Sequence, residues 1–500
     1  MKLWIQFQPR NFNLKRPTQD SQTRRPSTTM TTPNTINVND IVFPSQPSLS
    51  TLLTSLKRST LSIHNRLTSI LSDAEFVHQA AQALRQPPSN NEANQETQER
   101  VPRPLIANER CGSWYIPPGD KYASAYFKST DGHERAWKFS TRRLNLHLLD
   151  MIEKHDGIII VDSTRRGKRM PDALSTTVPI WCTVLNTILL PSHPLSSQLF
   201  LPPHLLPTTH AQITALIPQF VASFKALNLQ DLPKIAKPLR PFWVTQDSVL
   251  GPHLEAQDQT PGTIYASYRP VICLTASRRN TSTSEIDSNG YIQGAADDTE
   301  NWARGLTPAL FWANRDLLLS TPEPELPGLI ASLVRTAPAI AADNPTTQLT
   351  PQISVCALPL PPSTGCCISL TNAPTPKDGW AKSATSMDVG LGKHKTASRN
   401  LRTALPHICD FASACLQRDP QGMVTVACES GKDTSVGAAL ALSCYLFDDE
   451  GQFRVPDETA RFTKTLVKMR LGRIMTVYPE ANPSRQTLQS VNSFLMDWAK

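Results

Sequence analysis

The sequence contains no run of about twenty consecutive apolar residues, which is the length that an α-helix needs to cross a membrane. Its ten cysteines include no Cys-x-x-Cys pair and no spacing typical of metal ligands. The first thirty residues have no continuous apolar core of the kind that secretory signals carry. These absences exclude a membrane-spanning helix and a cysteine-rich zinc module, and they predict reduced thiols in a cytosolic or nuclear protein.

Proline is abundant instead, and many of the 43 prolines lie in stretches such as 191–207 and 338–362. Residues 1–45 are rich in Thr, Pro, Asn, Gln and Ser, a composition typical of a disordered tail. We predict a mixed α/β domain with catalytic and RNA-binding roles over residues 46–340. A proline-rich connection that leads into a second domain follows over 341–384, and a smaller α/β domain occupies 385–500.

The formal net charge of +8 favours an anionic partner. Nucleic acid, phosphorylated small molecules and membrane surfaces all fit this description. A basic protein without such a partner is the alternative.

One segment near the C-terminus looks like the phosphate-binding loop of a cysteine phosphatase. An apolar run over 422–427 precedes Cys428, and an alanine- and leucine-rich run over 436–447 follows the loop. Backbone N–H groups at such a strand-to-helix turn bind an anion. A phosphatase of this type needs an arginine six positions after its cysteine, and this chain has Thr434 there. We therefore predict phosphate binding without hydrolysis, by Cys428, Gly431, Lys432, Asp433 and Ser435, and the alternative is an ordinary buried thiol.

A second segment, residues 157–172, combines a buried strand with a basic loop. The apolar run 157–161 is typical of a parallel strand, and α/β sheets bind ligands at the carboxyl ends of such strands. Asp162 follows the strand and is a candidate ligand of Mg²⁺ or of a ribose hydroxyl. Candidates for binding a pyrophosphate or an RNA backbone are Ser163, Thr164, Arg165, Arg166, Lys168 and Arg169. An exposed turn is the alternative.

The strand-then-cation pattern repeats at 269–279, where Arg278 and Arg279 end an apolar run. Three carboxylates follow at Asp297, Asp298 and Glu300. They suit either Mg²⁺ binding and general-base catalysis or the N-terminus of a helix, and the residues alone favour neither. Residues 137–149 are predicted to be helical and carry Arg142 and Arg143.

Seven segments, in this order, resemble the initiator tRNA 2′-O-ribosyl phosphate transferases of fungi and plants. The segments are YFKSTDGH, KFSTRRLNLHL, DSTRRGKRMPDALSTTVPIW, YIQGAADDTENWARGLTP, SRNLRTALP, CESGKDTSVG and PSRQTLQSVNSFLM. The resemblance covers roughly residues 50–500. It implies that the second domain is similar to dual-specificity phosphatases, although Ala427 and Thr434 stand where such enzymes have His and Arg.

The resemblance implies transfer of a ribosyl phosphate from 5-phosphoribosyl 1-diphosphate to the 2′-hydroxyl of a T-stem purine in cytoplasmic initiator methionine tRNA. This mark excludes the tRNA from elongation. The leaving pyrophosphate requires cations and Mg²⁺, for which we expect Asp162 and Asp298 as metal ligands. Catalytic candidates are Asp162, Asp297, Asp298 and Glu300, and RNA-binding candidates are Lys128, Arg142, Arg143, Arg278 and Arg279. A phosphatase and a non-catalytic tRNA-binding protein are the alternatives.

Overall fold

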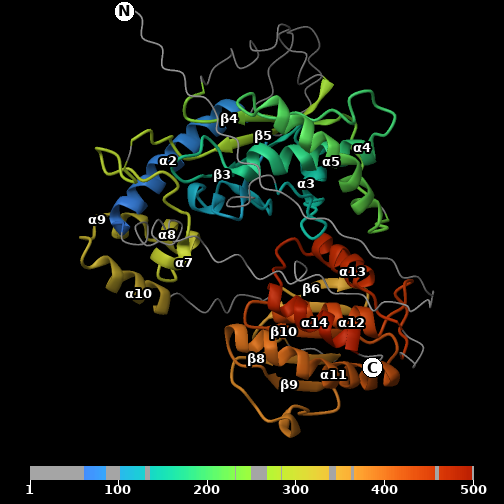
Figure 1. Ribbon diagram of the computed structural model, residues 1–500. Helices are drawn as coiled ribbons and strands as arrows, with labels where there is room; N and C mark the ends of the chain where they lie inside the picture. The colour runs from blue at the N-terminus through green and yellow to red at the C-terminus, as the bar shows by residue number, and fades with distance from the viewer. Residues whose placement is uncertain are drawn as a thin grey trace, which may run out of the picture. The chain divides into compact units, whose positions relative to one another are not determined.

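The computed structural model describes residues 61–85, 102–129, 136–230, 232–248, 267–282, 284–336, 345–361, 365–455 and 461–497 (Figure 1). They form two five-stranded sheets with helices, so the α/β class is confirmed. The tail predicted over 1–45 lies outside the described residues. No helix among the described residues combines the length and apolar character that a membrane span requires. All ten cysteines lie in the described residues and are free thiols.

The first sheet is entirely parallel and has the strand order β2-β1-β3-β5-β4. Its strands are β1 (Leu105–Asn108), β2 (Lys121–Ala125), β3 (Ile158–Asp162), β4 (Leu239–Val244) and β5 (Arg269–Thr275). All five residues of β3 are buried, because helices cover both faces of the sheet and β-branched side chains pack well there. Ile158 and Ile160 join one core cluster, and Ile159 and Val161 join the other.

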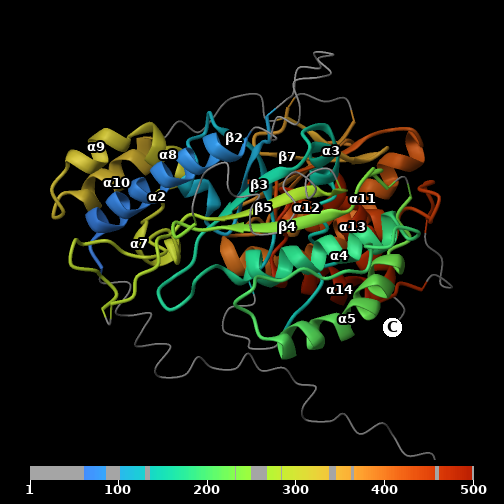
Figure 2. The same cartoon turned by 90° about the horizontal axis from the view of Figure 1, so that it is seen from above.

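One face of this sheet packs against α3 (His147–Lys154), α4 (Val178–Leu189) and α5 (Pro207–Lys225). Figure 2 shows α4 and α5 lying side by side along the sheet. The other face packs against α2 (Ile63–Leu84) and a row of short elements. These elements are the 3₁₀ turn Gly112–Tyr115 and the helices α7 (Thr299–Trp302), α8 (Pro308–Ala313), α9 (Arg315–Ser320) and α10 (Leu326–Thr336).

The helix predicted over 137–149 is wrong for most of its length, because α3 begins only at His147. The preceding segment forms tertiary hydrogen bonds in place of helical ones. The backbone carbonyl of Leu144 accepts a hydrogen bond from Trp181 Nε1 at 2.6 Å, and Asn145 Oδ1 accepts one from the backbone N–H of Tyr126. Asn145 also has a φ of 51°, which interrupts a helix.

The second sheet has the strand order β6-β7-β10-β8-β9, and only the pair β6–β7 is antiparallel. Its strands are β6 (Thr347–Thr350), β7 (Ile353–Ala357), β8 (Cys366–Thr371), β9 (Ser386–Gly390) and β10 (Val424–Cys428). Its helices are α11 (His394–Arg418), α12 (Thr434–Tyr445), α13 (Lys464–Val477) and α14 (Arg485–Asp497). Strands from residues 347–371 therefore belong to the same sheet as β10.

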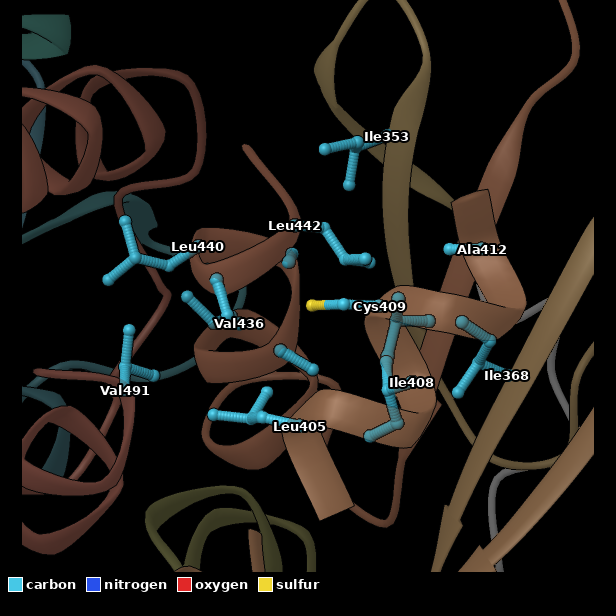
Figure 3. Packing of buried hydrophobic residues seen from close by; sticks show 14 of the residues in the cluster. Ile353, Ile368, Leu405, Ile408, Cys409, Ala412, Val436, Leu440, Leu442 and Val491 are labelled. Carbon is cyan, nitrogen blue, oxygen red and sulfur yellow. The ribbon is translucent and has the colours of Figure 1, made fainter. Parts of the chain in front are cut away.

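Helix α12 lies at the centre of the second domain, and every one of its residues is buried. Figure 3 shows Leu405 and Cys409 of α11 beside Val436 of α12, in a cluster that also contains Val491 of α14. A Cβ atom added to Gly437 would lie 2.3 Å from Thr487 Cγ2, so the missing side chain allows α14 to approach closely. This packing holds the N-terminus of α12, which follows Cys428, in a fixed position.

Gly112 allows the turn after β1 to lie directly over β3. A Cβ atom there would lie 2.3 Å from the carbonyl oxygen of Val161 and 3.2 Å from the backbone of Ala107. We predict that Gly112→Ala lowers the free energy of unfolding by about 1–3 kcal/mol, because the backbone atoms must move apart. Urea denaturation measures this change. Gly119→Ala is the matched control, since nothing lies within 4 Å of a Cβ there, and equal losses in the two variants would contradict the prediction.

Candidate active site

The order of the first sheet reverses between the carboxyl ends of β1 and β3, and we call this point the crevice. All five strands are parallel, so their carboxyl ends share one edge. In the strand order, β2, which follows β1 in the sequence, lies on one side of this point. Strands β4 and β5, which follow β3, lie on the other side. Open α/β sheets bind ligands at such a reversal. Asn108 and Asp162 end the two strands, and Glu109, Arg110 and Cys111 follow β1.

Asp162 is completely buried at this crevice, and protein donors surround its carboxylate. Its oxygens lie 2.9 Å from Asn108 Nδ2, 2.8 Å from the backbone nitrogen of Ser163, 3.0 Å from Cys111 Sγ and 3.3 Å from Arg110 Nη2. Burial raises the pKa of Cys111, so this residue donates as a neutral thiol. In this arrangement Asp162 orients its neighbours.

Arg110 joins the two predicted carboxylates Asp162 and Asp297. Its Nη1 lies 2.9 Å from Asp297 Oδ1, and its Nη2 donates to the carbonyl oxygen of Ser163. Burial alone would lower the pKa of Arg110, but the negative charges of Asp162 and Asp297 raise it above its ordinary value. The Arg110 side chain is 28% exposed, and it forms part of the lining of the pocket described below.

The other acidic candidates are placed differently. Asp298 and Glu300 are exposed, and Asp298 adopts a φ of 56° just before α7. Among the described residues, no group of three or more His, Cys, Asp or Glu side chains is arranged to hold a metal ion. The protein alone therefore provides no complete metal cage in this part of the chain. A direct ligand role for Asp162 or Asp298 stays a prediction.

The basic loop after β3 is tied to the loop after β5. The backbone nitrogen of Thr164 lies 3.1 Å from Ser277 Oγ, and that hydroxyl donates back to the carbonyl oxygen of Thr164. Ser163 and Thr164 are both buried. Arg166 lies 3.3 Å from Glu285, and Lys168 lies 2.8 Å from Asp172. Two of the predicted phosphate-binding cations thus have acidic partners.

The remaining cations of these loops lie at the same edge of the sheet. Arg165 is partly buried, and Arg169 is exposed. Arg278 contacts Asp287 at 2.7 Å and stacks on the ring of Tyr291, while Arg279 is exposed. Arg169 and Arg279 are therefore accessible to an anionic partner at this edge.

A pocket of about 800 Å³ opens beside the crevice. Residues after β1 and along β2 contribute most of its polar lining, and Arg143 stacks on Tyr126 with 4.7 Å between guanidinium carbon and ring centroid. Burial lowers the pKa of Lys128, and Arg142 and Arg143 lower it further. The polar lining comprises Glu109, Arg110, Ser113, Lys121, Ser124, Tyr126, Lys128, Ser129, Arg143, Thr307, Lys432, Glu480 and Asn482.

Arg142 and Arg143 contact a loop of the second domain. Arg143 donates to the carbonyl oxygen of Pro479 and to Asn482 Oδ1, both at 2.8 Å. Arg142 donates to the carbonyl oxygen of Pro483 at 3.1 Å. These contacts occupy part of the hydrogen-bonding capacity that we expected the two arginines to offer to RNA.

Glu109 and Arg110 are the site residues that the sequence analysis missed. They follow β1, which has only four residues and no strong pattern. The signal was present, because the apolar run Leu105-Ile106-Ala107 is followed at once by polar residues, as it is after β3. The pairing of β1 with β3 shows that the residues after β1 lie beside those after β3.

The Cys428 loop has the shape expected of a phosphate-binding loop. Gly431 has a φ of 66°, and a Cβ atom there would lie 2.7 Å from the backbone nitrogen of Ala357. Cys428 Sγ lies 3.1 Å from Ser435 Oγ. Burial would raise the pKa of Cys428, but hydrogen bonds from Ser435, Thr434 and the backbone N–H of Asp433 lower it overall. The loop stabilises a thiolate without an arginine.

The charged side chains of this loop do not converge on the thiol. Lys432 pairs with Glu480 at 2.5 Å, and Asp433 accepts hydrogen bonds from Thr487 Oγ1 and the backbone N–H of Ser484. A pocket of about 160 Å³ beside Cys428 is lined by Glu429, Asp433 and nine residues without a cationic side chain. Phosphate binding by Cys428, Gly431 and Ser435 stays a prediction that depends on backbone N–H groups.

Comparison with known proteins connects both domains to one family. Residues 56–335 match the family model of the Rit1 N-terminal domain, and residues 385–495 match that of the Rit1 DUSP-like domain. The chain is 33% identical to the tRNA A64-2′-O-ribosylphosphate transferase of Saccharomyces cerevisiae, over 90% of this chain and 95% of that protein. It is 34% identical to an uncharacterized protein of Schizosaccharomyces pombe, over 86% and 94% of the two chains.

Among solved structures, a leucine-rich-repeat and phosphatase-domain protein of Entamoeba histolytica covers 30% of this chain and 89% of its own. The identity is 12% and the TM-score is 0.20, so this likeness is too weak to support an argument.

The hydrogen bonds around Cys428 predict how the pKa of its thiol responds to mutation. We expect the pKa of Cys428 to lie below that of an ordinary cysteine and to rise in Ser435→Ala, because the hydroxyl no longer stabilises the thiolate. Thiolate absorbance near 240 nm, followed against pH, measures the shift, and Cys428→Ser supplies the background. An unchanged titration in Ser435→Ala would show that the hydroxyl does not control the thiol.

Proposed function

This chain belongs to the Rit1 family. From that membership we propose that it transfers a ribosyl phosphate from 5-phosphoribosyl 1-diphosphate to a tRNA. The acceptor is the 2′-hydroxyl of a T-stem purine in cytoplasmic initiator methionine tRNA. The modified tRNA is excluded from elongation, and the protein works in the cytoplasm, where this tRNA is used. The observation that carries the proposal is 33% identity across both domains to a relative named for this transfer.

The reaction makes one bond and breaks another. The acceptor 2′-oxygen bonds to C1 of the donor ribose, and the bond from C1 to the pyrophosphate oxygen breaks with its electron pair on pyrophosphate. The negative charge that develops on the leaving group must be stabilised as the bond lengthens. Lys121, Lys128 and Arg143 bring positive charge to the pocket beside the β1–β3 crevice, and Arg110 also belongs to its lining.

Mg²⁺, when bound to the donor pyrophosphate, supplies further neutralisation of the leaving group. An ion carried by pyrophosphate needs only one or two protein carboxylates, so the absence of a three-ligand group among the described residues is compatible with it. Of the two carboxylates named from the sequence, Asp298 is exposed and stays a candidate, whereas Asp162 is buried and its oxygens are bonded to protein donors. The loop Ser163 to Arg169 is the second candidate for contacts with the donor phosphates or the tRNA backbone.

Recognition of the tRNA depends on the shape of its stem, because an A-form helix exposes phosphates and 2′-hydroxyls in a shallow minor groove. The exposed Arg169 and Arg279 lie on loops at the carboxyl edge of the first sheet, beside the candidate site. The net charge of +8 supports an RNA partner, and we expect the affinity to fall steeply with salt.

The Cys428 loop then serves to bind a phosphate of the donor or of the tRNA. Two features speak against hydrolysis: Thr434 replaces the arginine clamp, and two carboxylates line the adjacent pocket. A phosphatase would hydrolyse phosphorylated substrates and lose this activity in Cys428→Ser.

The deciding experiment is transfer of radiolabel from 5-phosphoribosyl 1-diphosphate, with Mg²⁺, to unmodified initiator tRNA. We expect label on the initiator and none on elongator methionine tRNA. Arg166→Ala and Asp298→Asn test the candidates named from the sequence, and Cys428→Ser tests whether the thiol takes part. Tight tRNA binding without label would contradict the proposal and identify a non-catalytic tRNA-binding protein.

A further inference from the structure

We propose that Glu109 is the base that accepts the proton of the acceptor 2′-hydroxyl. This inference rests on the proposed transfer function and adds a residue that the sequence motifs do not contain. A ribose hydroxyl is a weak nucleophile, and a positioned carboxylate that removes its proton in the transition state accelerates the attack.

The position of Glu109 follows from the sheet. It is the first residue after β1, at the strand end beside which the chain order reverses. It lines the large pocket together with Lys121 and Lys128, the cations assigned to the leaving pyrophosphate. Its side chain is 28% exposed, so it is accessible from the pocket but held by its surroundings.

The hydrogen bonds of Glu109 leave one carboxylate oxygen for a substrate. Oε1 lies 2.5 Å from Lys121 Nζ, 2.9 Å from Ser113 Oγ and 2.5 Å from Ser124 Oγ. Each of its hydrogen bonds to another described residue ends on Oε1. Oε2 is thereby left for the hydroxyl of the acceptor, while three donors hold the group in one orientation.

The other acids near the site are less suited to this role. Asp162 and Asp297 are buried and bonded to Arg110. Asp298 and Glu300 do not belong to the lining of the pocket. Glu480 lines the pocket but forms an ion pair with Lys432 that is about half exposed. Glu109 alone combines pocket access with fixed orientation among the carboxylates of this lining.

In the proposed step, the proton of the 2′-hydroxyl passes to Glu109 Oε2 as the 2′-oxygen bonds to C1 of the donor. The electron pair of the broken C1–O bond leaves with pyrophosphate. Glu109 ends the step as a neutral acid, and it returns the proton to solvent through the open pocket. No oxidant, reductant or further reactant is required.

The test is single-turnover transfer with Glu109→Gln, which keeps the shape of the side chain and removes the base. We expect the transfer rate to fall by about 10²- to 10⁴-fold, while the affinities for initiator tRNA and donor change little. Glu153→Gln is the matched control. Its carboxylate is also 28% exposed and lies 2.5 Å from a cation, but that cation is Arg269, at the amino end of β5. We expect this control to transfer at the wild-type rate.

A second variant separates catalysis from folding. In Glu109→Ala, added formate should raise the transfer rate in proportion to its concentration, because a free carboxylate replaces the missing base. Failure of formate to raise the rate of Glu109→Ala would overturn the role of Glu109 as base. Recovery of the Glu109→Gln rate by raised Mg²⁺ would also overturn it, because Glu109 would then be a metal ligand. A wild-type rate in Glu109→Gln would overturn the inference alone. Absence of label with the wild-type protein would overturn the proposed function and this role together.

Discussion

The bridge that Arg110 forms between Asp162 and Asp297 is the interaction on which the first domain's site depends. Asp162 is fully buried, and a buried carboxylate without a partner is strongly destabilising, by about 3–5 kcal/mol when one member of such a pair is removed. Asn108, Cys111 and the backbone of Ser163 satisfy the remaining oxygen positions. The bridge ties the end of β1 to the end of β3 and to the segment before α7, which places Glu109 at the rim of the pocket.

The pocket beside β1 and β2 and the pocket beside Cys428 differ in the charges of their lining residues. The pocket beside β1 and β2 includes the cations Lys121, Lys128 and Arg143, whereas the pocket beside Cys428 has Glu429 and Asp433 and no cationic lining residue. The pocket beside β1 and β2 is therefore the more positively charged of the two. The second domain keeps the geometry that lowers the pKa of Cys428, even though the arginine of a phosphatase is replaced by Thr434.

Side chains that the sequence groups together serve separate purposes in the fold. Within the acidic run 297–300, Asp297 turns inward to Arg110, while Asp298 and Glu300 remain at the surface. Within the Cys428 loop, Lys432 and Asp433 bind residues of the loop before α14. Adjacent residues in a turn or at the start of a helix point in different directions, so closeness in sequence does not establish a shared site.

The sequence alone determined the α/β class, because buried β-branched runs such as 158–161 and 424–426 alternate with helical patterns. It also determined the Cys428 loop and the family resemblance, since both depend on residues that are consecutive along the chain. Only the tertiary structure decided that β1 lies beside β3, which brings Arg110 to Asp162 across 52 positions of sequence. It likewise decided that the segment before His147 is not helical, because Trp181 Nε1 donates a hydrogen bond to the carbonyl oxygen of Leu144. Strand order and long-range hydrogen bonds arise from packing of the whole sheet, and no local pattern in the sequence encodes them.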